Sequence, residues 1–441
     1  MNLLTDKVRT LYLKYLCAAF GSAMILCVYS IVDMAIVGQY QGPSGTAALA
    51  VVAPIWNIIF SLGMLMGIGG SVIFSTIRGN FPRDRKISNE IFTASAIGAV
   101  IISVLVWAAI ILFEDQIFIG FGADETLLYY AKRYMVPILF AVPLFLYNQM
   151  LAAFLRNDNN PSLATIGVLA GGVFNIAGDY IFVFVFQMGI FGAGLATALG
   201  AVVSFVVLLG HFFSRKNTLK FVKPTQFWDK IKQICITGFS TFFIDIAMGI
   251  LTILFNRQIM LYLGADALAV YGPIINISTF VQSCAYSVGQ AAQPIISVNF
   301  GAKANARIKE VLKYSLYSVA LFSIFWTALS LLYPNLYVRI FMNPTENILK
   351  IAPEIIRTYS VSFILLPLNI FATYYLQAIV KPKAAFALSV LRGLVISGGL
   401  ILILPRVFGG NAIWDSMPVT ELVIAFMATF LIRKYTKRLA Q

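Results

Sequence analysis

Long apolar stretches separated by short polar breaks recur along the whole 441-residue chain. Each stretch has about 18 or more mostly apolar residues, the length with which an α-helix crosses the hydrocarbon core of a bilayer. The pattern therefore predicts an all-α membrane protein with twelve transmembrane helices. The predicted spans are 11–37, 47–77, 89–113, 127–155, 161–185, 190–213, 233–262, 266–297, 306–332, 351–379, 383–404 and 411–433.

The composition agrees with this interpretation, because 60% of the residues are hydrophobic and only 11% are charged. Ordinary soluble domains carry roughly 25% charged residues, so a soluble enzyme is excluded. The net charge of +14 arises from 32 lysines and arginines. Most of them fall on the same side of the membrane as the N-terminus, which the positive-inside rule makes cytoplasmic. We expect a multi-pass inner-membrane protein with both termini in the cytoplasm and no nucleic-acid partner.

The chain contains an internal duplication. Residues 48–58 read ALAVVAPIWNI and residues 267–277 read ALAVYGPIINI, with eight of eleven positions identical. The two copies are separated by six predicted helices, an even number, so they have the same orientation in the membrane. This predicts a parallel repeat about an axis along the membrane normal, an arrangement suited to alternating access.

The duplication predicts three parts of the chain: an N-lobe at 1–213, a cytoplasmic connector at 214–232 and a C-lobe at 233–441. Pro54 and Pro273 occupy equivalent positions in the two copies. Because proline lacks an amide donor and bends a helix, both are predicted hinges.

A few ionisable residues fall at membrane depth, where charge is costly and usually faces a cavity. They are Asp33, Asp179, Asp245, Glu421, Arg257 and Arg392. Asn175 lies on the same helical face as Asp179, and Thr197 lies in the next helix. These oxygen ligands suit a hard cation such as Na⁺, and two neighbouring carboxylates could instead share a proton. Alternatively, Asp33 and Asp179 are unrelated and each bonds a neighbouring helix.

Several aromatic and soft side chains lie near these positions and predict a cavity for organic cations, through cation–π and sulfur contacts. Asp245 would be either a substrate contact or a polar packing group. The candidate cavity residues are Tyr29, Trp56, Met64, Tyr147, Asp245, Tyr271, Gln282 and Tyr286.

The absence of several enzyme motifs excludes some classes of function. The sequence has no G-x-x-x-x-G-K-[ST] loop, no H-E-x-x-H and no G-x-S-x-G, so we expect neither an ATPase nor a hydrolase, and no cofactor. The single histidine, His211, lies at a predicted cytoplasmic helix end and is expected to contact lipid headgroups. Glu421 and Arg392 are expected to form a buried pair with a structural role.

Five motifs give the chain a resemblance to the MATE (multidrug and toxic compound extrusion) transporters, nearest to the DinF-like and MepA-like bacterial branch. They are Val32–Gly38, Leu155–Asp158, Asn175-x-x-x-Asp179-Tyr180, Gly192–Thr197 and Gly289–Ile296. The resemblance implies a V-shaped fold of two six-helix lobes and cation-coupled efflux of drugs. It also implies that Asp33, Asn175, Asp179 and Thr197 form the N-lobe site for a proton or Na⁺.

The sequence therefore favours a monomeric secondary antiporter that exports organic, often cationic, compounds in exchange for H⁺ or Na⁺ and contacts membrane lipids. The alternative is a flippase for lipid-linked saccharides with a similar two-lobe architecture. Its anionic substrate would need a basic cavity, so Arg257 and Arg392 lining the cavity would favour it. A membrane-embedded enzyme or receptor is the third class, and no nucleophile–base pair in the sequence supports an enzyme.

Overall fold

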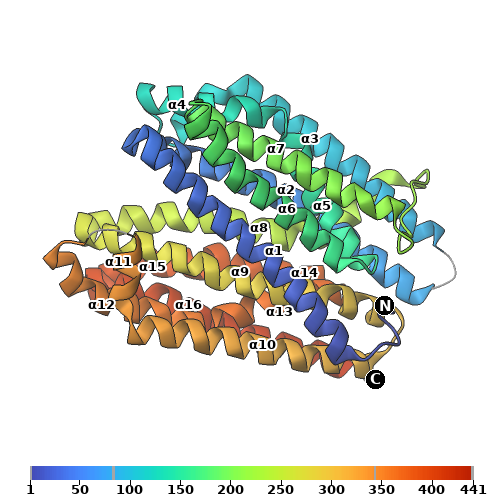
Figure 1. Ribbon diagram of the computed structural model, residues 1–441. Coiled ribbons are helices and arrows are strands. Elements are labelled where there is room, and N and C mark those ends of the chain that lie inside the picture. The colour runs from blue at the N-terminus through green and yellow to red at the C-terminus, as the bar shows by residue number, and fades with distance from the viewer. Residues whose placement is uncertain (1, 82–84, 342–343, 439–441) are drawn as a thin grey trace. The chain divides into compact units, whose positions relative to one another are not determined.

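The computed structural model describes residues 2–81, 85–341 and 344–438, and this part of the chain is helical without a strand (Figure 1). The chain divides into two compact units. The first unit consists of Met1–Asp6 and Cys17–Phe242, and the second consists of Lys7–Leu16 and Phe243–Gln441. The helices α1 and α8 each have their two ends in different units, because both unit boundaries fall inside a helix.

The chain begins with the elements α1 (Val8–Gln41), α2 (Pro43–Asn80), α3 (Lys86–Gly120), α4 (Glu125–Leu139), α5 (Val142–Asn157), α6 (Pro161–Asp179), η1 (Tyr180–Val185), α7 (Ile190–Leu209), η2 (Gly210–Phe213) and α8 (Phe227–Tyr262). It continues with α9 (Ala265–Gly301), α10 (Asn305–Leu332), α11 (Pro334–Phe341), α12 (Glu346–Ser360), η3 (Val361–Ile364), α13 (Leu366–Ala378), α14 (Pro382–Val390), η4 (Leu391–Val395), α15 (Ile396–Phe408), η5 (Gly410–Asp415) and α16 (Ser416–Arg438).

Eleven helical segments of the described chain are long and apolar enough to cross a membrane, and the bent pair α4–α5 makes a twelfth if it is one span. Each of the predicted spans falls on one of these segments. The expected all-α fold with two sets of six spans is therefore confirmed.

The fourth span of the first half is broken, and the fourth span of the second half contains a 3₁₀ segment. The axes of α4 and α5 differ by 58°, where the sequence predicted one span. Pro137 near the end of α4 and Pro143 at the start of α5 remove backbone donors on both sides of the bend. In the second half, η3 separates α12 from α13, which begins at Leu366 and Pro367. Both fourth spans thus depart from a regular α-helix just before a proline, Pro143 or Pro367.

The fifth span of each half contains a π-helical segment. η1 follows Asp179 directly, and η4 contains Arg392. The wider turn of a π segment is uncommon and is often found at functional sites. In both halves, an ionisable residue, Asp179 or Arg392, therefore lies next to or within a π-helical segment.

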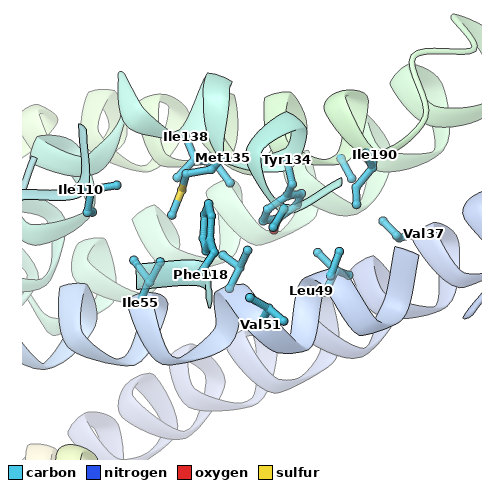
Figure 2. Packing of buried hydrophobic residues seen from close by; sticks show 14 of the residues in the cluster. Val37, Leu49, Val51, Ile55, Ile110, Phe118, Tyr134, Met135, Ile138 and Ile190 are labelled. Atoms are coloured by element: carbon cyan, nitrogen blue, oxygen red, sulfur yellow. The ribbon is translucent and has the colours of Figure 1, made fainter. Parts of the chain in front are cut away.

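An apolar cluster packs α2 against α4 in the first unit (Figure 2). Leu49, Val51 and Ile55 of α2 lie below Tyr134, Met135 and Ile138 of α4, and Ile190 of α7 lies beside Tyr134. The ring of Tyr134 is 3% exposed. This packing fixes the ring, so the direction of its hydroxyl group is set by the fold.

The helix α1 is the least buried of the spans, with 17% of its apolar window buried inside the protein. In the first unit, polar contacts attach it to its neighbours. The Thr165 hydroxyl donates to the Ala18 carbonyl over 2.7 Å, and the Ser22 hydroxyl donates to Thr165 over 3.2 Å. A helix with little buried apolar surface can shift at low cost, and α1 carries Asp33.

Asp158 is the centre of a buried polar network at the end of α5. One of its carboxylate oxygens lies 3.0 Å from Nη1 of Arg78, and the other lies 2.8 Å from Nε2 of His211 and accepts from the Thr218 amide over 2.8 Å. Asn160 Nδ2 lies 3.0 Å from Nδ1 of His211. The prediction that His211 contacts headgroups is wrong, because the chain after α7 folds back and buries the ring completely.

Candidate functional site

Asp33 lies in α1 with its side chain directed into the first unit, where it is only 8% exposed. The Tyr134 hydroxyl donates a hydrogen bond to Asp33 Oδ2 over 3.0 Å. Its other oxygen, Oδ1, is buried and has no hydrogen-bond partner among the described residues. Tyr134 was not among the residues predicted from the sequence, since nothing in the neighbouring sequence distinguishes it from other interfacial tyrosines.

Asp179 is the last residue of α6 and is completely buried. Neither of its carboxylate oxygens has a hydrogen-bond partner within the described part of the chain. One turn earlier, Asn175 Nδ2 donates to the Thr197 hydroxyl over 3.0 Å, and Asn175 Oδ1 is buried without a partner. Buried polar groups nearly always have a hydrogen-bond partner, so these buried oxygens without one call for an explanation.

These residues belong to one group. Asp33 and Asp179 lie close enough to influence each other electrostatically, and Tyr29 and Tyr134 lie close to both carboxylates. The group contains Tyr29, Asp33, Tyr134, Asn175, Asp179 and Thr197, from four helices of the first unit, and is called the acid group below. The structure thus brings together all four residues predicted for the cation or proton site.

The acid group has the chemistry of a site for a hard cation or a proton. Among the described residues, four buried oxygens of Asp33, Asp179 and Asn175 have no hydrogen-bond partner. No group of three or more His, Cys, Asp or Glu residues that could hold a metal ion occurs in the described ranges. Carboxylate, amide and hydroxyl oxygens fit Na⁺, and two adjacent buried carboxylates also fit a shared proton.

Close helix packing sets this geometry. A Cβ atom on Gly194 of α7 would collide with the backbone carbonyl of Tyr134 in α4. Where α6 crosses α7, a Cβ on Gly171 would lie 2.7 Å from the Gly200 carbonyl oxygen, and the reverse distance is 2.8 Å. Small residues let membrane helices approach in this way. These glycines allow Tyr134, Asn175 and Thr197 to converge.

Gly194→Ala is expected to lower the stability of the protein by about 1–3 kcal/mol, because the added methyl group forces α7 away from α4. The matched control is Gly210→Ala, since a Cβ there meets nothing within 4 Å. The measurement is the melting temperature of each purified variant in detergent. Equal melting temperatures for the two variants would contradict the packing argument.

The residues predicted to line a substrate cavity lie at several places. In the first unit, Tyr29 belongs to the acid group, whereas Trp56 packs edge-on against Phe145 with a ring separation of 4.5 Å. Tyr147 packs against Phe205 at 5.8 Å. Met64 is buried, with 3% of its surface exposed.

In the second unit, Tyr271 and Gln282 line one cavity of about 50 Å³ together with Ser278, Tyr359 and Arg392. Asp245 follows the cavity-lining residue Ile244 in α8 and accepts a hydrogen bond from the hydroxyl of Tyr286 over 3.1 Å. Tyr286 follows Gln282 by one turn on the same face of α9. The second unit therefore contains a small polar and aromatic cavity with a carboxylate close to it.

Glu421 and Arg392 form the buried pair that the sequence predicted. Arg392 Nε and Nη2 lie 2.9 and 2.8 Å from Glu421 Oε1. Arg257, the other basic residue at membrane depth, has an exposed side chain. Pro54 lies inside the continuous helix α2 and Pro273 inside α9, so their role as hinges stays a prediction.

A family model described as MatE matches residues 18–181 and 241–397, which is more than half of the chain. The chain belongs to the MatE family. It is therefore a membrane transporter and not an enzyme, and the resemblance predicted from its motifs is confirmed. The family model matches residues in both halves of the chain, so both units resemble the family.

Curated relatives and solved structures agree with this assignment. The chain is 25% identical over 421 residues to the multidrug export protein MepA of Staphylococcus saprophyticus, covering 95% of this chain and 92% of the relative. It is 24% identical to MepA of Staphylococcus aureus, covering 94% and 91%.

Among solved structures, a multidrug resistance transporter of the MATE family in an outward-facing conformation superposes with a TM-score of 0.91 at 19% identity, covering 99% of this chain and 98% of that one. A transporter of the MOP superfamily from Pyrococcus furiosus gives a TM-score of 0.90 at 19% identity, covering 100% and 98%. At this identity the likeness establishes the fold alone.

Proposed function

We propose that the protein exports organic, often cationic, compounds from the cytoplasm across the inner membrane in exchange for H⁺ or Na⁺. The observation that carries the proposal is the acid group, with its unpartnered buried oxygens on Asp33, Asp179 and Asn175. Buried carboxylates without a partner are costly, and an entering cation or proton removes that cost. The names of the MepA relatives support drugs as the substrate class.

In this proposal, α1 converts cation binding into movement. The helix is the least buried span, and its Asp33 is held by a hydrogen bond from Tyr134. A proton or Na⁺ at the acid group neutralises charge and changes how Asp33 binds its neighbours. Binding drives the transport cycle only if the cation favours one conformation over the other. Each charge that moves inward across the membrane yields about 2.3 kcal/mol per 100 mV.

The two arginines at membrane depth bear on the flippase alternative. Arg392 does line the cavity of the second unit, which by itself would favour an anionic substrate. Its charge is compensated by Glu421 at 2.8 Å, and Arg257 is exposed. With Asp245 also close to the cavity, the balance of charge in the second unit favours a cationic substrate over a lipid-linked saccharide.

The proposal is tested with purified protein in liposomes that contain a fluorescent lipophilic cation. A pH gradient and a Na⁺ gradient are imposed separately, with protein-free liposomes as the control. We expect one of the two gradients to drive the dye against its own concentration gradient. Dye movement that depends on neither gradient would contradict coupled antiport.

A further inference from the structure

Both carboxylate oxygens of Glu421 accept hydrogen bonds from side chains, one of which belongs to Arg392. Glu421 is completely buried in α16. Arg392 donates to Oε1 through Nε at 2.9 Å and Nη2 at 2.8 Å. The second oxygen, Oε2, accepts from Asn369 Nδ2 over 2.6 Å. The chain itself thus supplies a cation and an amide to this carboxylate.

The pair lies in two spans that the duplication makes equivalent to two of the four helices of the acid group. In the second half, Arg392 belongs to the fifth span (Pro382–Phe408) and Glu421 to the sixth (Gly410–Lys437). In the first half, Asp179 belongs to the fifth span and Thr197 to the sixth. The two halves therefore place a buried acid in the same pair of spans. Within the described part of the chain, Asp179 has no hydrogen-bond partner, whereas Glu421 is paired with Arg392.

Stability alone is a weak reason for such a pair. Removing two ions from water costs several kcal/mol each, and apolar residues of the same volume are often as stable. The guanidinium also borders the cavity lined by Ser278, Gln282 and Tyr359, so it is reachable from an open space. Arg392 lies at a cavity wall and inside a π-helical segment, and its partner is a buried carboxylate. This placement indicates a role in the charge balance of the site.

We propose that Arg392 is a tethered cation. It permanently occupies the place that an exchangeable cation would take beside Glu421, so the second unit binds no coupling ion at this carboxylate. Glu421 is then not a site of the proposed ion exchange, whereas the acid group of the first unit is. This inference rests on the proposed function, because it says which buried carboxylate the exchanged ion does not occupy.

The other ionisable groups around the cavity keep their own partners. Asp245 of α8 accepts from the Tyr286 hydroxyl of α9. The rings of Tyr271 and Tyr359 pack against each other with centroids 6.3 Å apart. Removing the Arg392 guanidinium would thus expose one specific unpaired carboxylate, Glu421, beside a cavity that a small cation can enter.

The experiment removes the guanidinium and supplies it again from solution. We expect Arg392→Ala to reduce export by about tenfold or more, because it leaves a buried charge uncompensated. Guanidinium at low millimolar concentration should restore much of the export and raise the melting temperature of the variant. Urea, which has a similar shape and no charge, should do neither. Wild-type protein and the exposed-arginine variant Arg406→Ala serve as controls and should not respond to guanidinium.

A second variant separates charge balance from packing. Arg392→Met/Glu421→Gln removes both charges, and we expect it to recover most of the export lost in Arg392→Ala without responding to guanidinium. If Arg392→Ala does not fold, the double variant tests the proposal instead. A double variant that folds and exports supports the proposal. A double variant that folds but does not export overturns it.

The proposal is also overturned if guanidinium stabilises folded Arg392→Ala no more than it stabilises the wild type. The melting-temperature response needs no transport, so it tests the tethered cation even if the wild-type protein fails to couple drug movement to an ion gradient.

Discussion

Asp33→Asn is expected to abolish gradient-driven export while the protein stays folded and inserted. The amide has almost the same shape as the carboxylate and keeps an oxygen that can accept from Tyr134, which lies 3.0 Å away. It cannot take up a proton, and it contributes no negative charge toward Na⁺. The acid group would then hold one carboxylate, and cation binding would no longer change the attachment of α1.

The measurement is dye export by reconstituted protein under the gradient that drives the wild type. Asp415→Asn is the matched control, because Asp415 is an exposed carboxylate at the end of η5. Both variants should elute from size-exclusion chromatography like the wild type and reconstitute in equal amounts. Full export by correctly inserted Asp33→Asn would refute the assignment of Asp33 to coupling.

Asp158→Ala is expected to cause the largest loss of stability, of about 3–5 kcal/mol. Asp158 is completely buried and pairs with Arg78 at 3.0 Å and with His211 at 2.8 Å. Truncation leaves the mostly buried guanidinium of Arg78 without its carboxylate. It also removes the acceptor of the Thr218 amide, a hydrogen bond that attaches the connector to the end of α5.

The melting temperature in detergent and the yield of monodisperse protein check this expectation. The matched control is Asp115→Ala, which breaks an ion pair with Lys132 between two exposed side chains. Exposed pairs contribute about 0–1 kcal/mol, so the control should melt almost like the wild type. Comparable losses in the two variants would show that burial of the Asp158 network does not carry the effect.

Much of the fold could be predicted from the sequence because its signals are local. Hydrophobic length marks each span, and the duplicated segments around Pro54 and Pro273 identify the two halves. The bend between α4 and α5 was not predicted, although Pro137 and Pro143 lie beside it. Apolar character continues across that bend, and hydropathy averages over it.

The candidate site was predicted only in part. Asp33 and Asp179 were identified because charge at membrane depth is rare and costly. Tyr134 is separated from Asp33 by 101 positions, and no periodicity connects the two residues. His211 was assigned to the membrane surface because it follows a long apolar span, and the fold buried it against Asp158 and Asn160.

The sequence by itself determined that this chain is a two-half membrane transporter of the MatE family, since span length, the distribution of basic residues and the family motifs are properties of neighbouring positions. The tertiary structure decided which acids have partners. The buried carboxylate of Asp179 has no hydrogen-bond partner among the residues that the structure describes, and that of Glu421 is bound by Arg392. The physical reason is that the state of a buried carboxylate depends on what other helices place within about 3 Å of it, and helix packing alone fixes that distance.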